Sequence, residues 1–150
     1  MQLEHLCDVE LMYRREPLYE DLLKMVVPYD TLEGSLYGEG DGTFQGQRLS
    51  GTARWVNHAR RRSDGVNLPD MHGVIRTDDG AFVLFTFQGR TLPTQDDKRR
   101  QLLTVCFEAE DERYRWLNTA ICVLEGLISS PITGSGKMRA RIYSCVHELD

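Results

Sequence analysis

Hydrophobic and polar residues alternate along most of this chain, a pattern typical of β-strands that bury one face. The clearest run covers residues 48–57. Its apolar phase is expected to face inward and holds Leu49, Gly51, Ala53, Trp55 and, at the end, Asn57. Similar runs over residues 3–13, 102–108, 120–127 and 138–147 predict further strands.

The strongest turn signal lies near the middle of the chain, at Asp79-Gly80. Asp followed by Gly accepts the positive φ angles of a tight hairpin, and runs rich in Val, Ile and Phe flank it on both sides. In the incoming strand, Asp70, His72 and Val74 share one face because successive side chains alternate. The central element is therefore predicted to be a β-hairpin that presents a carboxylate and an imidazole together.

Three segments interrupt the alternation. Pro17 suits the first turn of a helix and the apolar residues up to Val26 fall at helical spacing, so a short helix or ordered loop is predicted to end before Pro28. Residues 110–118 predict one or two helical turns that begin with acidic side chains. The polar, charged stretch from Arg90 to Arg100 is expected to be a mobile loop because it has little to bury.

Eight or so short antiparallel strands with frequent glycines predict an all-β fold, either a closed barrel or a sandwich. The six glycines between residues 34 and 51 suit strands that bend sharply, as barrels require. With 150 residues, the chain is expected to form a single domain. An eight-stranded barrel has room for its own side chains and one small ligand.

Composition and charge exclude several classes of function. The net charge of −5 argues against a nucleic-acid partner, and the short basic run at residues 60–62 is expected to be a solvated loop tip rather than an anion clamp. No apolar run approaches the ~20 residues of a membrane span, and no secretory signal is recognisable, so a cytoplasmic protein is expected. Nucleotide-binding motifs are absent and no cofactor is predicted.

Cysteine and histidine spacing predicts no metal site. Cys7, Cys106, Cys122 and Cys145 form no CxxC pair, and each lies in an apolar run, which favours buried core thiols. The four histidines likewise show no metal-ligand spacing.

Asp70 and His72 are the candidate catalytic pair. If their face lines the barrel, the carboxylate would orient and stabilise the imidazole, which could then act as a general acid or base near neutral pH. The alternative is that both are ordinary polar residues on the outer face or at the rim. Sequence alone does not fix which face is inward.

Seven further residues are candidates for ligand binding because they combine apolar or aromatic surface with polar groups. Trp55 and Trp116 could serve as pocket walls, and Glu108 is a candidate inward acid whose pKa burial would raise. The remaining candidates are Asn57 and His58 at a strand end, and Tyr114 and Asn118 on the short helix.

An ordered set of short motifs spans nearly the whole chain. They are Leu3-Glu4-His5-Leu6, Gly42-Thr43-Phe44-Gln45-Gly46, Leu49-Ser50-Gly51, Trp55, Asp64-Gly65, Thr77 to Ala81, Asp111 to Asn118, and Ile142-Tyr143. Together they resemble domain of unknown function family 3237, also called uncharacterised protein family 0311. The resemblance implies a small β-barrel of lipocalin-like or streptavidin-like architecture and brings no settled activity. Where members tend to have Asp-x-Arg-Tyr, this chain has Asp70-Met71-His72-Gly73, which favours a specialised role.

These observations lead to a first hypothesis and two alternatives. The first is a barrel that binds one small, largely apolar molecule, with cofactor-free acid/base catalysis of an isomerase, dehydratase or cyclase type. The alternatives are a ligand carrier or sensor without chemistry, and a protein-interaction module whose interior is filled by side chains. A homodimer is a reasonable expectation from the strand edges and the apolar segment from Leu18 to Val27.

Overall fold

The structure is a computed structural model that describes residues 1–14, 23–93, 96, 98–129 and 137–150. Strands account for most of these residues, and the described part contains a single short 3₁₀ helix, η1 (Arg115–Thr119). The strands are β1 (Gln2–Tyr13), β2 (Leu23–Val26), β3 (Gly34–Gln45), β4 (Gly51–Arg61), β5 (Asn67–Leu68), β6 (Asp70–Thr77), β7 (Phe82–Pro93), β8 (Lys98–Ala109), β9 (Cys122–Ser129) and β10 (Lys137–Val146).

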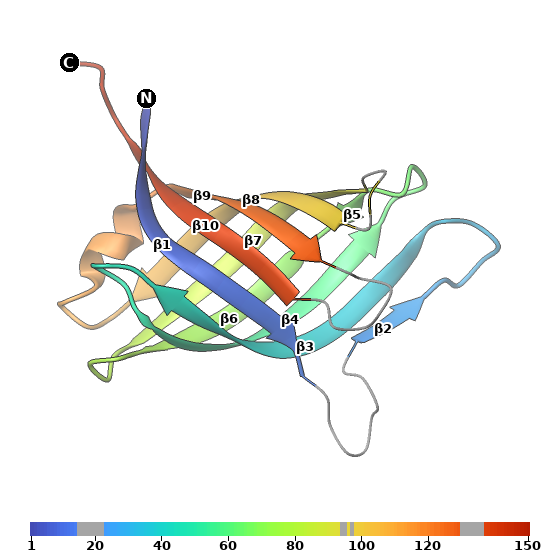
Figure 1. The fold of residues 1–150 in the computed structure, drawn as a ribbon, viewed down its shortest axis with the longest axis horizontal. Coiled ribbons are helices and arrows are strands. Elements are labelled where there is room, and N and C mark those ends of the chain that lie inside the picture. The colour runs from blue at the N-terminus through green and yellow to red at the C-terminus, as the bar shows by residue number, and fades with distance from the viewer. Residues whose placement is uncertain (15–22, 94–95, 97, 130–136) are drawn as a thin grey trace.

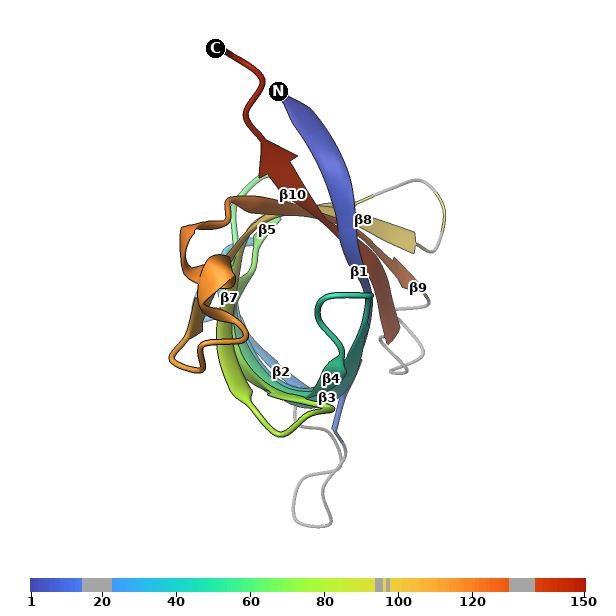
Figure 2. The same ribbon diagram turned by 90° about the vertical axis from the view of Figure 1, so that its left-hand side faces the viewer.

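Eight of these strands close into a ring. Each pairs antiparallel with the next in the order β1, β3, β4, β6, β7, β8, β9 and β10, and β10 pairs back with β1. Figures 1 and 2 show the ring from the side and from the end where η1 lies. The short strand β2 pairs with β3, and the short strand β5 pairs with both β4 and β7. The predicted all-β, antiparallel fold of about eight strands is confirmed.

The inward phase of β4 agrees with the alternation in the sequence. Ala53, Trp55 and Asn57 are buried, and Leu49 is buried just before the strand begins. In β1 the pattern is less regular, because a register shift between His5 and Cys7 changes the phase, and Leu3 is 52% exposed. The inward side chains of β1 therefore begin only near Cys7.

The predicted hairpin forms between β6 and β7. Gly80 has a φ of +90°, the conformation that glycine adopts without strain. The backbone N–H of Thr77 donates to the carbonyl of Ala81 at 2.8 Å and that of Gly80 to the carbonyl of Thr77 at 3.0 Å, so the turn spans Asp78 to Gly80, one residue longer than the expected Asp79-Gly80.

The two ends of the lumen differ in what fills them. Antiparallel pairing places the carboxyl ends of β1, β4 and β7 and the amino end of β8 at one end of the ring. At the opposite end lie η1 and a packed apolar cluster that includes Phe44, Phe85 and Phe87, with ring centroids of Phe85 and Phe87 4.7 Å apart. Leu117 of η1 is fully buried against this cluster, so the η1 end is filled by the protein's own side chains.

Several predicted details differ from the structure. Residues Leu23–Val26 form strand β2 rather than the end of a helix; residues 15–22 of that prediction lie outside the described part. The expected loop over residues 90–100 is mostly strand, since β7 continues to Pro93 and β8 begins at Lys98. Residues 94, 95 and 97 of that prediction lie outside the described part. Pairing across the barrel wall accounts for both differences, since it gives these backbones partners that local propensity does not show.

The cysteine, arginine and membrane predictions have mixed outcomes. Cys7 and Cys122 are buried, whereas Cys106 is exposed and Cys145 is half-buried, so only two are core thiols. The basic run continues β4 up to Arg61, and Arg62 pairs with Asp64. No helix in the described part is long and apolar enough to cross a membrane.

Candidate functional site

Asp70 and His72 do form a pair, but on the outer wall. His72 Nε2 lies 2.9 Å from Asp70 Oδ1, and both side chains are about half exposed. The Gln88 amide also donates to Asp70, and these contacts hold the pKa of the Asp70 carboxyl below its ordinary value, with the Gln88 bond the larger cause. The side chains of β6 that point inward are instead those of Met71 and Ile75. The expectation of a lumen-facing dyad is therefore corrected: the alternative outer-face position is the one found.

His58 and Glu108 also lie on the outer face. His58 is exposed and meets the ring of Tyr37 edge-on, with centroids 6.3 Å apart. Glu108 is exposed, and the inward residue beside it on β8 is Phe107. The prediction of an inward acid at Glu108 is wrong because its phase on β8 is the outer one.

The candidates near η1 hold that end of the ring together. The Tyr114 hydroxyl donates to Asp79 of the hairpin turn at 2.8 Å. Asn118 binds both the backbone N–H and the carbonyl of Ala109, at 2.7 and 2.8 Å. The guanidinium of Arg48 stacks 3.6 Å from the centroid of Trp116. These contacts tie the β3–β4 and β6–β7 turns to η1, and each of the three side chains has a structural partner.

Trp55 and Asn57 are the sequence-predicted candidates that face the lumen. The Trp55 indole donates to the carbonyl of Asp41 at 2.9 Å, and its ring meets that of Tyr13 edge-on at 4.8 Å. Asn57 is 6% exposed, and its Nδ2 donates to the Tyr13 hydroxyl at 3.2 Å. Burial raises the pKa of Tyr13, so its phenol keeps its proton at neutral pH. Together Trp55, Asn57 and Tyr13 form an aromatic and polar corner of the lumen.

A second polar pair, Thr91 and Gln101, is buried in the lumen. Thr91 is 2% and Gln101 5% exposed, and Gln101 Nε2 donates to Thr91 Oγ1 at 2.8 Å. The side-chain carbonyl Oε1 of Gln101 is buried and has no hydrogen-bond partner among the described residues. A native interior rarely leaves such a group unsatisfied, and each case calls for an explanation.

The two polar pairs lie at the same end of the ring. Tyr13 and Asn57 are near the carboxyl ends of β1 and β4, Thr91 is near that of β7, and Gln101 is near the start of β8. This is the end opposite η1. The polar groups thus lie at the end opposite η1, among buried apolar side chains such as Leu11 and Met138 that belong to the same cluster.

Tyr13, Thr91 and Gln101 were missed by reasoning from the sequence, although their phase was readable. Gln101 shares its face with the buried Leu103, two residues on, and Thr91 shares its face with Phe87. A polar residue at a position where the alternation of a strand predicts an apolar one is therefore the signal that indicates such a site.

Metal and thiol chemistry find little support in the described part of the chain. No three His, Cys, Asp or Glu side chains there come together as a cation site. Burial raises the pKa of the Cys7 thiol to about 12 and that of Cys122 to about 11, so both are poor nucleophiles at neutral pH.

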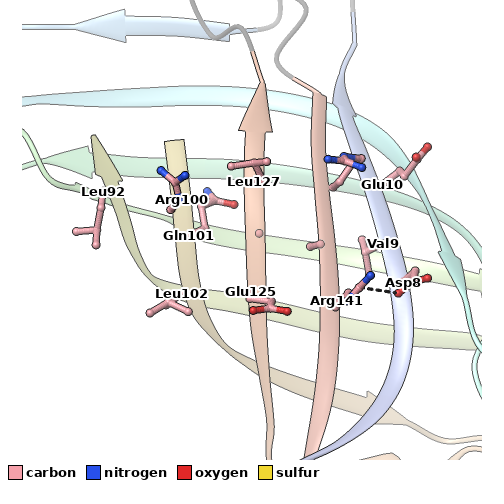
Figure 3. A pocket seen from close by; sticks show the side chains of 13 residues that line it. Asp8, Val9, Glu10, Leu92, Arg100, Gln101, Leu102, Glu125, Leu127 and Arg141 are labelled. Atoms are coloured by element: carbon pink, nitrogen blue, oxygen red, sulfur yellow. Dashed lines mark ion pairs between the residues drawn. The ribbon is translucent and has the colours of Figure 1, made fainter. Parts of the chain in front are cut away.

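A groove of about 640 Å³ lies over β1 and β7–β10 (Figure 3), and its lining includes the inward residues Val9, Gln101, Gly126 and Ala140 as well as outward ones. Among its lining side chains are three acids, three arginines and three leucines: Asp8, Glu10, Glu125, Arg100, Arg139, Arg141, Leu92, Leu102 and Leu127. The charges of these lining residues balance. Arg141 approaches Asp8 at 3.9 Å, and the Tyr143 hydroxyl donates to Glu125 at 2.9 Å.

Comparisons with known proteins agree with this fold. Residues 3–143 match the model of a family described as "Protein of unknown function (DUF3237)". A β-barrel-like protein from Acinetobacter baumannii is similar in structure (TM-score 0.79, 18% identity, covering 95% of this chain and 94% of that one). So is a protein of unknown function from Clostridium acetobutylicum (TM-score 0.80, 15% identity, 97% and 100% covered).

A third solved structure is described as an enzyme from Penicillium herquei (TM-score 0.62, 20% identity, 95% and 93% covered). At these sequence identities, the similarity to the three structures concerns the fold alone. No curated protein matches the chain.

Proposed function

This chain belongs to the DUF3237 family, and we propose that it binds one small, largely apolar molecule inside the ring, at the end opposite η1. The observation that carries the proposal is the burial of three polar side chains, Asn57, Thr91 and Gln101, among apolar ones, with the partly buried Tyr13 bonded to Asn57. Burying polar groups costs free energy that a plain structural core avoids. Apolar walls with a few placed polar groups are typical of small-molecule sites.

The surroundings of these pairs suit an apolar ligand. Trp55 and Met71 supply large apolar surface, whereas Ala140 and Gly126 on β10 and β9 are small. A Cβ atom placed on Gly126 would lie 3.3 Å from both Gln101 Oε1 and Leu124 Cδ2, so one polar and one apolar side chain border this position.

An acid/base step of an isomerase, dehydratase or cyclase type would use Tyr13. Its hydroxyl oxygen accepts a hydrogen bond from Asn57, which leaves the phenolic proton available to a ligand. The phenol is protonated at neutral pH, so it could donate its proton to a ligand, and burial, which raises its pKa, makes that proton harder to release. Asp70 and His72 lie outside the lumen and take no part in this proposal. The fold neighbour described as an enzyme makes catalysis on this scaffold a reasonable reading.

Binding is tested with N-phenyl-1-naphthylamine, a neutral probe whose fluorescence rises in apolar surroundings. We expect saturable binding to the wild-type protein. Ala140→Phe should weaken it at least about tenfold by filling the lumen, while Arg76→Phe, on the outer face of β6, should leave it unchanged. A milder Ala140→Leu variant covers the case in which the phenylalanine variant does not fold. Equal binding by both folded variants would place the probe elsewhere and overturn the proposal.

The Tyr13→Phe variant distinguishes catalysis from ligand transport, because it keeps the aromatic ring and removes the phenolic hydroxyl. Wild-type protein is incubated with a bacterial or fungal metabolite extract, and changes are followed by mass spectrometry. A compound consumed by the wild type but not by Tyr13→Phe indicates an enzyme that uses this phenol. A compound retained unchanged by both proteins indicates a carrier or sensor.

A second candidate function, self-assembly, is supported by the groove over β1 and β7–β10. Its lining carries three acids and three arginines, so the groove is neutral although the whole chain has a net charge of −5. Two copies could therefore approach there without strong repulsion. Glu10 and Arg100 lie on opposite sides of the groove (Figure 3). A two-fold axis parallel to the strands, between β9 and β10, would bring Glu10 of one copy to Arg100 of the other.

Charge reversal tests this assembly by sedimentation equilibrium. Two strands separate Glu10 from Arg100, about 14 Å within one chain, too far for direct contact. We expect Glu10→Arg and Arg100→Glu each to weaken a dimer and the double reversal to restore it. Arg76→Glu, on the distant outer face of β6, should have no effect. A wild-type protein that stays monomeric at high concentration would exclude this candidate.

A further inference from the structure

The one buried polar atom without a partner in the described chain is the carbonyl oxygen of the Gln101 side chain. The other atom of this amide, Nε2, donates to Thr91 Oγ1 at 2.8 Å, which fixes the plane of the amide. Oε1 is left with two lone pairs and no donor, although the residue is only 5% exposed. An unsatisfied buried acceptor is costly, and a matching donor on a ligand removes that cost.

The neighbourhood of this oxygen follows from the pairing of the adjacent strands. Register pairs Gln101 with Thr91 on β7 and with Gly126 on β9, and Gly126 pairs in turn with Ala140 on β10. Oε1 lies 3.3 Å from the point that a Cβ of Gly126 would occupy. Leu124 Cδ2 lies at the same distance from that point, so the nearest side chain of β9 is apolar and offers no donor.

We infer that the molecule bound in the lumen carries a hydroxyl or N–H group that donates a hydrogen bond to Gln101 Oε1. This inference rests on the proposed function and narrows the ligand to apolar molecules with a donor. Ethers, esters and hydrocarbons of the same shape are disfavoured, because they leave the carbonyl unsatisfied. Thr91 acts as the positioning residue, since its hydroxyl holds the amide with Oε1 turned toward Gly126.

Three naphthalene probes of similar size test this assignment by equilibrium dialysis. 2-Naphthol offers a donor, 2-fluoronaphthalene offers none, and 2-naphthaldehyde offers only an acceptor. For the wild-type protein we expect 2-naphthol to bind about tenfold more tightly than 2-fluoronaphthalene. In Gln101→Leu, which keeps the size of the side chain but removes both polar atoms, the ratio should fall to about one.

Thr91→Val provides a second variant that leaves Gln101 in place. Without the Thr91 hydroxyl the amide is free to rotate, so the preference for 2-naphthol should shrink while 2-fluoronaphthalene binds as before. Thermal unfolding shows whether each variant is folded.

The outcomes separate this inference from the proposed function. Binding of all three probes with equal affinity to the wild type would overturn the donor assignment and leave the lumen site standing. Tightest binding of 2-naphthaldehyde, lost in Gln101→Leu, would show that the amide is turned the other way, and would also overturn it. No binding of any probe would remove the lumen site and this inference together.

Discussion

The side chain of Asn57 connects Tyr13 inside the ring to the backbone of Asp70 on the neighbouring strand. Its Nδ2 donates to the Tyr13 hydroxyl at 3.2 Å, and its Oδ1 accepts from the Asp70 N–H at 3.1 Å. One buried amide thus fixes the Tyr13 phenol and the start of β6. This amide joins the backbone that carries the outer Asp70–His72 pair to the lumen.

Replacing Asn57 by Leu should therefore destabilise the protein. Both partners lose a hydrogen bond in a buried setting, so we expect the free energy of unfolding to fall by about 1–3 kcal/mol. Urea denaturation measures the change. His58→Ala, one residue on and exposed, should stay within about 0.5 kcal/mol of the wild type. A loss at Asn57 no larger than at His58 would show that this connection contributes nothing.

Gly73 faces inward and leaves room for the ring of Phe85. A Cβ atom on Gly73 would lie 2.3 Å from Phe85 Cζ and 2.7 Å from the carbonyl oxygen of Arg54. Gly73→Ala should consequently lower the free energy of unfolding by about 1–3 kcal/mol. Gly126→Ala, whose nearest contact is 3.3 Å, is the matched control and should cost less. Equal effects of the two substitutions, measured by thermal unfolding, would contradict this packing.

Asp111 should give the protein an acid-sensitive contact. Its hydrogen bonds to the side chain and backbone of Arg113 lower the pKa of the carboxyl from 3.8 to about 2. A lowered folded-state pKa stabilises the protein above pH 3.8, and this contribution is lost as the pH falls toward 2. Asp111→Asn should therefore flatten the loss of stability between pH 4 and pH 2. Thermal unfolding across this range measures it, and an unchanged slope would rule the contact out.

The four cysteines should differ sharply in reactivity. Cys106 is exposed on the outer face of β8, while Cys7 is buried with its pKa raised to about 12. At pH 8 a disulfide reagent such as 5,5′-dithiobis(2-nitrobenzoate) should label Cys106 within minutes and leave Cys7 and Cys122 unlabelled until denaturant is added. Cys106→Ser should remove the fastest phase. Rapid labelling of Cys7 in the native protein would contradict this prediction and show that the strands around Cys7 separate transiently.

Alternation predicted much of the fold, because a barrel wall imposes a strict two-residue period. It worked on β4, where every second residue from Leu49 to Asn57 is buried. It failed on β6, where inward Gly73 has no side chain to mark the phase and the outward Val74 suggests the opposite one. The missing bulk at Gly73 comes from Phe85 on the next strand, which the sequence of β6 cannot reveal.

The candidate site was only partly predictable. Trp55 and Asn57 were found because they lie in an unambiguous apolar phase. Gln101 lies just before the strand predicted over residues 102–108, and Tyr13 is the last residue of the strand predicted over residues 3–13, whose alternation is imperfect, so neither was considered. Register between strands brings these residues to one end of the ring, and register depends on contacts far apart in sequence.

The closure of the ring has a consequence for how the chain reaches this state. β1 pairs on one side with β3 and on the other with β10, the strand that follows all others in chain order. Until β10 is in place, the long edges of β1 and β9 offer unpaired backbone groups to any other strand. Aggregation during synthesis should therefore depend on how soon β10 arrives, and conditions that delay it should be the most damaging to yield.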